Sequence, residues 1–394
     1  MKFTDLSPEQ QQRWRDNVAR LGINPDTAGN RYARYKMIPD LQKFREIVNA
    51  PIQENQRNPS ITHSELQSIS DKRLQNVVMA HVSGASMITD QKVIDEINRR
   101  FEDGFMATVY AHPNLMVTAE NPLIIDSATA ITQYGAITIK SGGYIKILVP
   151  CAFECQSLVK ELNSTPGSAY DFYVLGRDGA PGDNGSNGED GASGSAGADA
   201  VANCSSADVP AGLGTAGTNG LDGKQGSNGT QGTDGTEVGI TIYSLNSVIS
   251  ILNQGGQGGA GGNGGSGGKG GNGGQGGNGD TCNGGLVKGG HGGNGGNGGN
   301  GGNGGNGGNG GNGGNLTVYV NSSAIKQVTV VNGNAPGGKR GAEGTGGVAG
   351  LPGAGGSHGG ENGDPGTQGS NGSPGIDGSA GDKGTSKVLS IPQP

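Results

Sequence analysis

The sequence has few of the residues that build ordinary cores. Aromatic residues make up only 4% of its 394 residues, and tryptophan occurs once, at Trp14. No apolar run is long enough to span a bilayer, and the first residues lack the apolar core of a cleavable signal peptide. No basic stripe accompanies the net charge of -7, which argues against nucleic acid or an anionic membrane as the main partner.

Groups for metal or acid–base chemistry are also scarce. Cys151 and Cys155 have a spacing that resembles half a metal site, but no second cysteine or histidine pair completes it. Buried thiols or a disulfide are the alternatives, and neither a metal nor a cofactor is expected. The five histidines and the carboxylates show no catalytic spacing, and GxGxxG matches arise by chance in glycine runs, so an enzyme is not predicted.

Residues 1–104 have the patterns of a helical N-terminal domain. Ser7 and Pro8 are typical of a helix start, and apolar residues recur at helical spacing. The predicted helices cover 7–21, 40–49, 63–82 and 89–104. His81 and Trp14 are interpreted as packing residues between helices.

After Gly104 the pattern changes to the alternation of β-strands, which predicts a β-rich junction domain over 105–175. Strand–turn–strand stretches of one outline occur at 135–149, 239–253 and 315–332. We interpret them as β-hairpins, the first closed by the SGG turn at 141–143.

Glycine dominates the remaining part, a third predicted domain over 176–394. Of the 84 glycines, only 7 precede residue 151. Glycine then recurs at every third position, which a disordered linker has no reason to maintain. The repeats, numbered runs 1 to 6 below, cover about 176–197, 214–235, 255–279, 289–314, 338–359 and 360–384.

A period of three fits polyproline II geometry, in which each run would be about 70 Å long. Collagen shares this period but relies on far more proline than the scattered residues present here. The predicted fold class is therefore multidomain: an N-terminal α+β region followed by an antiparallel bundle of six polyglycine II helices with β-hairpin connectors. Runs 3 and 4 have two glycines per triplet and are expected to be central, with the third residue of each triplet in solvent.

Antiparallel order places three connectors, 198–213, 280–288 and 356–362, at the end of the bundle far from the N-terminal region. Cys204 and Cys282 both fall there, so a disulfide between them is hypothesised, with two unpaired thiols as the alternative. Polar residues of these loops are the candidates for receptor binding. They are Asn203, Ser205, Asp208, Asp280, Thr281, Asn283, Ser357, His358 and Glu361.

The glycine register over 176–384 resembles polyglycine II bundle proteins, namely snow flea antifreeze proteins and the receptor-binding adhesins of T-even-like phage long tail fibres. The adhesin resemblance implies attachment to a fibre or particle through the N-terminal region. It also implies recognition of a cell-surface receptor, protein or glycan, by the distal loops.

We therefore expect a non-enzymatic, adhesin-like binding protein. The missing signal peptide favours an extracellular or particle-associated location reached without signal cleavage. Two alternatives remain. One is a secreted host-directed factor, either a toxin or a self-assembling structural protein, whose active part is the N-terminal helical region. The other is an ice-binding protein.

Overall fold

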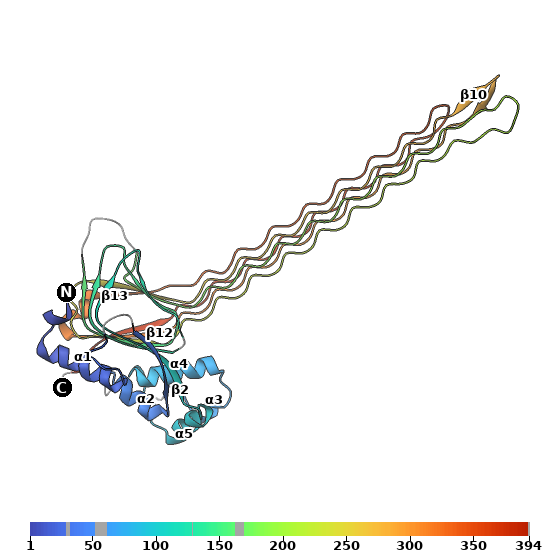
Figure 1. Ribbon diagram of the computed structural model, residues 1–394. Coiled ribbons are helices and arrows are strands. Elements are labelled where there is room, and N and C mark those ends of the chain that lie inside the picture. Colours follow the sequence, from blue (N-terminus) through green and yellow to red (C-terminus); the bar gives the residue numbers. More distant parts are fainter. Residues whose placement is uncertain (29–31, 52–60, 128, 162–168, 393–394) are drawn as a thin grey trace.

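The computed structural model describes residues 1–28, 32–51, 61–127, 129–161 and 169–392. The helices and most strands form a body, from which a long, thin shaft extends (Figure 1). A small hairpin lies at the far end of the shaft, which we call the tip.

The helices lie together on one side of the body (Figure 1). They are α1 (Pro8–Arg20), α2 (Leu41–Val48), α3 (His63–Leu66), α4 (Asp71–Val82) and α5 (Gln91–Arg100), with 3-10 turns η1 (Phe3–Asp5) and η3 (Ser322–Gln327). Three of the four predicted helices are confirmed. The prediction of one helix over 63–82 is wrong, because the Ser70 side chain accepts the backbone N–H of Arg73 and starts α4 as a separate helix.

The strands form two large sheets. Sheet A contains, in spatial order, β1 (Tyr32–Ile38), β2 (Phe105–Val117), β4 (Thr129–Ile139), β6 (Cys151–Lys160), β8 (Val238–Ile242), β12 (Asn315–Val320) and β14 (Thr385–Ser390). Sheet B contains β13 (Val328–Asn332), β9 (Ile249–Gln254), β7 (Phe172–Leu175), β5 (Ile145–Ile147) and β3 (Leu123–Ile125). Neighbouring strands are parallel throughout, except for the antiparallel pair β1–β2.

From β2 onward the chain alternates between the two sheets, so each passage through sheet A and then sheet B makes one coil. Successive coils stack and pair strand with equivalent strand, which is the path of a parallel β-solenoid. The space between the sheets is filled by buried side chains such as Phe153, Phe172, Ile240 and Ile251. A second core lies between the helices and sheet A, where the Trp14 indole N–H donates a hydrogen bond of 3.0 Å to the Gln133 carbonyl.

The predicted β-hairpins are wrong. In 135–149, 239–253 and 315–332 the first strand belongs to sheet A and the second to sheet B, so the two strands do not pair. The three stretches resemble one another because they are equivalent parts of successive coils. Alternation and turn residues show where strands begin and end, but they do not show which strands pair.

The predicted fold class is therefore wrong as well. The structure is an α/β fold with two large, mostly parallel sheets and few helices, and not an α+β region followed by a bundle of six polyglycine II helices with hairpin connectors. The glycine runs are extended segments without α-helix or β-strand. They leave the coils in out-and-back pairs: runs 1 and 2 between β7 and β8, runs 3 and 4 between β9 and β12, and runs 5 and 6 between β13 and β14.

The shaft continues the periodicity of the coils. Hydrogen bonds join residues 79 apart in runs 1 and 3 and in runs 3 and 5. They join residues 78 apart in runs 2 and 4, and 70 apart in runs 4 and 6. The outgoing runs therefore form one layer and the returning runs another. Each out-and-back pair of runs is an extension of one coil.

Glycine in the central runs is required by close backbone approach. Run 4 hydrogen-bonds to runs 2, 3, 5 and 6. A Cβ on Gly299 would lie 2.0 Å from the Leu221 carbonyl oxygen, and one on Gly298 would lie 2.0 Å from that of Gly347. Two faces of run 4 thus exclude any side chain, which accounts for two glycines in each triplet.

From residue 292 onward the third residue of each triplet in run 4 is asparagine, and these side chains are not simply in solvent. Each carboxamide Oδ1 accepts a backbone N–H from run 6 at 2.8 to 3.0 Å. We call this row the Asn ladder; it comprises Asn294, Asn297, Asn300, Asn303, Asn306, Asn309 and Asn312. It supplies acceptors for N–H groups that no neighbouring carbonyl reaches.

Candidate functional site at the tip

The tip brings together three connectors that are far apart in the sequence, 198–213, 280–288 and 356–362. In the second connector β10 (Asp280–Cys282) and β11 (Gly285–Val287) form a hairpin. Its two turn residues have positive φ, 45° at Asn283 and 84° at Gly284, which suits an Asn-Gly turn. In the first connector Val201 and Val209 form an antiparallel bridge.

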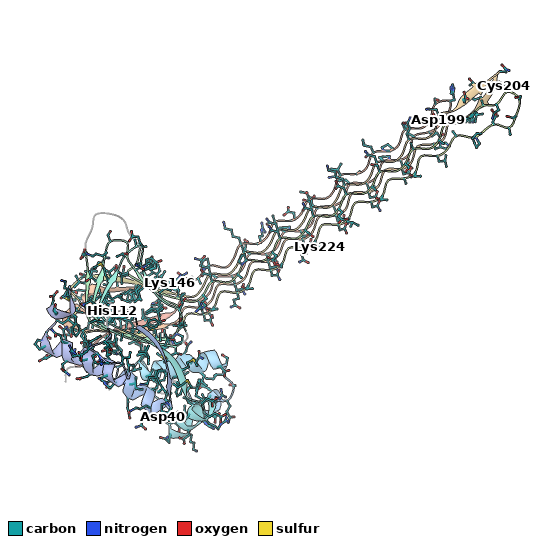
Figure 2. The ribbon with its side chains drawn as sticks, viewed as in Figure 1. Asp40, His112, Lys146, Asp199, Cys204 and Lys224 are labelled. Carbon is teal, nitrogen blue, oxygen red and sulfur yellow. A yellow bond between two sulfur atoms is a disulfide. The ribbon has the colours of Figure 1, made fainter. Side chains whose placement is uncertain are left out.

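A disulfide joins the first two connectors. Cys204 and Cys282 are bonded across a sequence separation of 78 residues, with their Cα atoms 5.6 Å apart. The Ala202 N–H also donates to the Asp280 carboxylate at 3.0 Å. Figure 2 shows Cys204 at the far end of the shaft, so this crosslink lies where the sequence placed the distal loops.

Some of the predicted binding residues hold the loops in shape. The Asp208 carboxylate accepts the Asn203 backbone N–H at 2.9 Å, and the Asn203 carboxamide donates to the Ala207 carbonyl. Hydrogen bonds from the backbone N–H groups of Ala202 and Thr281 lower the pKa of Asp280. The side chains of Asn203, Asp208 and Asp280 therefore stabilise the loop conformation that forms the surface of the tip.

The other predicted residues lie at the surface of the tip. Ser205, Thr281, Asn283, Ser357, His358 and Glu361 are all exposed. His358 has a left-handed backbone, with φ 60°, in the turn between runs 5 and 6. The Glu361 carboxylate lies 3.7 Å from the His291 imidazole.

Apolar residues of the tip were missed by the sequence analysis, which treated the connectors as polar. Val201, Val209 and Leu286 are 48%, 50% and 55% exposed, and Leu213 follows at 64%. Exposed side chains of this size on a disulfide-linked loop surface are the kind of residue that binding sites bury. The signal that could have found them is valine and leucine between the polar residues of 198–213 and 280–288.

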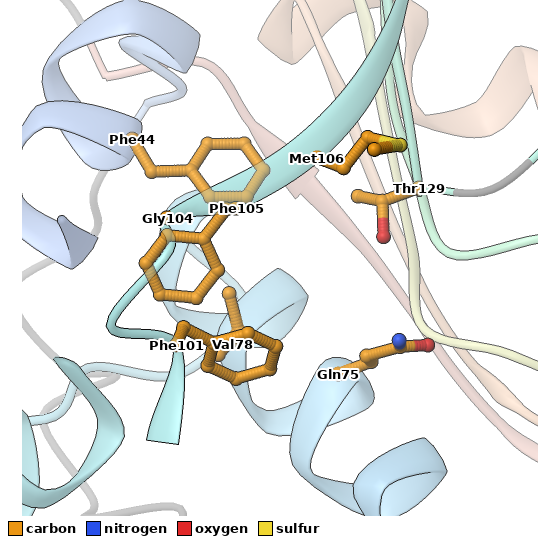
Figure 3. Close-up of a pocket in the computed structure, with 8 residues that line it drawn as sticks. All are labelled: Phe44, Gln75, Val78, Phe101, Gly104, Phe105, Met106 and Thr129. Carbon is orange, nitrogen blue, oxygen red and sulfur yellow. The ribbon is translucent and has the colours of Figure 1, made fainter. Parts of the chain in front are cut away.

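The body contains a hollow of 330 Å³ between helices and sheet A (Figure 3). Phe44, Phe101 and Phe105 surround it, and its polar lining side chains are Gln75 and Thr129. Of the residues that the structure describes, no acid, base or thiol lines this hollow, so they give it volume without groups for catalysis.

Buried acids occur elsewhere in the body. Glu154 on β6 accepts hydrogen bonds from the amides of Gln133, Asn17 and Gln156. Burial raises the pKa of Glu154 to about 7, against the opposing effects of the hydrogen bond from Gln133 and of nearby arginines. Burial likewise raises the pKa of Glu237 to about 7, where Asn315 donates to the carboxylate at 3.0 Å.

Cys151 and Cys155 are buried free thiols, which confirms the buried-thiol alternative and not the disulfide. Burial raises the pKa of both thiols far above its usual range. Among the described residues no group of three histidine, cysteine or acidic side chains is placed to hold a metal ion. Within the same residues, no helix has the length and apolar character needed to cross a membrane.

No protein-family model, curated protein or solved structure matches the chain. The resemblance to phage tail-fibre adhesins and snow flea antifreeze proteins is wrong, because the fold is α/β with two mostly parallel sheets and no comparison supports those families. The description of the chain as a tail fibre or collagen-like glycine-rich repeat is wrong for the same reason, since the glycine runs are parts of the coils of one α/β chain.

Proposed function

We propose that the protein is a non-enzymatic binding protein whose tip recognises a cell-surface receptor. The observation that supports this is the convergence of three distant connectors into one crosslinked, exposed surface at the end of the shaft. Loops positioned by a rigid scaffold are a common place for binding residues.

The tip has the composition of a small binding surface. Val201, Val209 and Leu286 supply exposed apolar area, and polar residues such as Ser205 and Thr281 lie beside them in the same connectors. Binding surfaces combine an apolar centre with a polar rim in this way. A protein or glycan receptor would bury the apolar side chains and hydrogen-bond to the rim.

The body is the attachment part in this proposal. The N-terminal helices cover sheet A at the end of the molecule opposite the tip (Figure 1), and a fibre or particle partner would bind there. The disulfide at the tip fits action in an oxidising, extracellular setting.

The proposal is tested by labelling the purified protein and measuring its binding to a panel of bacterial and animal cells. Val209→Asp and Leu286→Asp should weaken binding by at least about tenfold, because each places a charge in the apolar centre. The control is Leu351→Asp, which makes the same change at a side chain 66% exposed on the shaft.

The Leu351→Asp protein should bind as the unmodified protein does. If the tip variants keep full binding while their melting curves are unchanged, the tip is not the recognition site. Absence of binding to every cell type in the panel would also count against the proposal.

A further inference from the structure

The outer face of sheet B holds a hollow lined by aromatic and polar side chains. Helices cover the outer face of sheet A, through α1 and α4 on β4, β6 and β8. Sheet B faces the other side of the body (Figure 1), and its outward side chains are half-exposed. The hollow has a volume of 430 Å³ and lies beside the root of the shaft.

Tyrosine rings form one wall of the hollow. Tyr173 on β7 stands in register between Lys146 on β5 and Leu252 on β9, so these three side chains are direct neighbours across the sheet. The ring of Tyr144 meets that of Tyr173 edge to face at 5.5 Å. Tyr170 meets the same ring at 5.7 Å. Tyr144 and Tyr173 line the hollow, and the ring contacts among the three tyrosines order this aromatic surface.

Residues at the root of the shaft also line the hollow. They are Asp178 at the start of run 1, Gln254 at the end of β9 and Gln257 at the start of run 3. The Asp178 carboxylate accepts the Gln257 backbone N–H at 2.8 Å, which holds the two runs together. Figure 2 shows Lys146 on the body, at the side from which the shaft leaves.

The chemical groups that line the hollow indicate which class of ligand it can bind. Lys146 and Asp178 carry opposite charges, so the hollow has no net charge with which to attract a phosphate or a polyamine. Aromatic rings with amide, carboxylate and ammonium groups match a molecule that has apolar C–H faces and hydroxyl edges. The volume lies in the range of small-ligand pockets. We propose that this hollow binds a neutral saccharide, stacked on Tyr173 and Tyr144.

This site is independent of the tip, since it lies at the other end of the shaft. A protein with both sites would contact a sugar near its attachment end whatever its tip binds. The two proposals can therefore fail separately.

Calorimetric titration of the full chain with maltotriose, cellotriose, chitotriose and lactose tests the site. At least one should bind with a dissociation constant in the millimolar range or below. Tyr173→Ala should weaken that binding by at least about tenfold, since it removes the central ring of the wall. Tyr173→Phe keeps the ring and should bind within about threefold of the unmodified protein.

Leu286→Asp at the tip should leave sugar binding unchanged. The proposal is overturned if none of the four sugars binds at millimolar concentration. It is equally overturned if Tyr173→Ala binds sugar as well as the unmodified protein, or if titration of an apolar tripeptide shows tighter, Tyr173-dependent binding than any sugar.

Discussion

The carboxamide oxygen of Asn300 accepts a hydrogen bond of 3.0 Å from the backbone N–H of Ser370, seventy residues further along the chain. The same Asn300 donates its own N–H to the carboxylate of Asp222 in run 2. One residue of the Asn ladder thus connects three runs. The glycine runs are joined by two systems of hydrogen bonds, one between backbones and one from backbone N–H to side-chain oxygen.

Removing several acceptors from the Asn ladder should destabilise the shaft. In the triple variant Asn300→Ala, Asn303→Ala and Asn306→Ala, three N–H groups of run 6 lose their partners. Each loss should cost about 0.5 to 1.5 kcal/mol, because these groups lie near solvent and can bind water instead. Circular dichroism of the shaft should show a melting point lowered by several degrees.

The control is Asn300→Asp, which keeps an oxygen acceptor at the same atom position. This variant should melt within about a degree or two of the unmodified protein. An equal loss in the control would mean that the ladder acts through something other than the acceptor oxygen.

The prolines of the shaft mark its outer edges. Pro181 in run 1, Pro352 in run 5, and Pro365 and Pro374 in run 6 occupy third positions of triplets. In the described structure, third-position N–H groups of runs 1 and 6, such as those of Asn184 and Gln368, donate to no other run. In run 5, those of Arg340 and Gly346 donate only to side-chain oxygens of run 6. Runs 3 and 4 contain no proline, because their N–H groups are mostly used. Proline lacks this donor, so it fits only at an edge.

A matched pair of proline substitutions tests this account. Gln368→Pro lies at the edge of run 6 and should leave the shaft melting point nearly unchanged. Asn300→Pro removes the N–H that donates to the Asp222 carboxylate at 2.6 Å, and it also removes the side-chain acceptor of the Asn ladder at that position. It should therefore lower the melting point strongly. Similar losses for both variants would contradict the assignment of inner and outer positions.

The sequence could predict local features of this fold but not its pairing. The cap at Ser7, the register of the glycines and the doubled glycines of run 4 are local signals, and each follows from backbone geometry. Whether the strand of 145–147 turns back on 129–139 or crosses to another sheet is decided by its pairing with β3 on one side and β7 on the other. A single sequence carries no direct record of those contacts.

At the tip, too, only part of the structure could be predicted from the sequence. The positions of Cys204 and Cys282 could be derived by counting outgoing and returning runs. The internal roles of Asn203, Asp208 and Asp280 could not, because they depend on loop backbone geometry. Composition alone favoured these polar residues as binding groups and overlooked Val209 and Leu286, whose exposure is set by the disulfide-linked loop path.

Reduction of the disulfide should loosen the tip and leave the body intact. The glycine runs already hold the first two connectors near each other. The Cys204–Cys282 bond therefore constrains mainly the loop from 201 to 209. Hydrogen exchange at Ala202 and Val209 should therefore accelerate in Cys204→Ser or under dithiothreitol. Exchange in the body, for example at Val109, should not change. Acceleration throughout the chain would contradict a local role.

The stability of the body should fall as pH rises from 5 to 8. Glu154 and Glu237 have pKa values of about 7 in the fold, raised by burial from the usual 4.5. Above pH 4.5 the unfolded chain releases these protons while the folded chain retains them. The contribution of each group to the free energy of unfolding is therefore fully present below about pH 4.5 and is lost as pH rises through 7. The loss amounts to up to about 3 kcal/mol per group.

Urea unfolding followed by the fluorescence of Trp14, the only tryptophan, measures this effect in the body. The unfolding midpoint should be lower at pH 8 than at pH 5. Glu154→Gln removes one titrating group and should reduce the difference by about half, provided that the amide fits among Gln133, Asn17 and Gln156. The control Glu361→Gln, at an exposed residue of the tip, should leave the pH dependence as it is. A midpoint that is equal at both pH values, or higher at pH 8, would show that the two buried acids do not govern stability in this range.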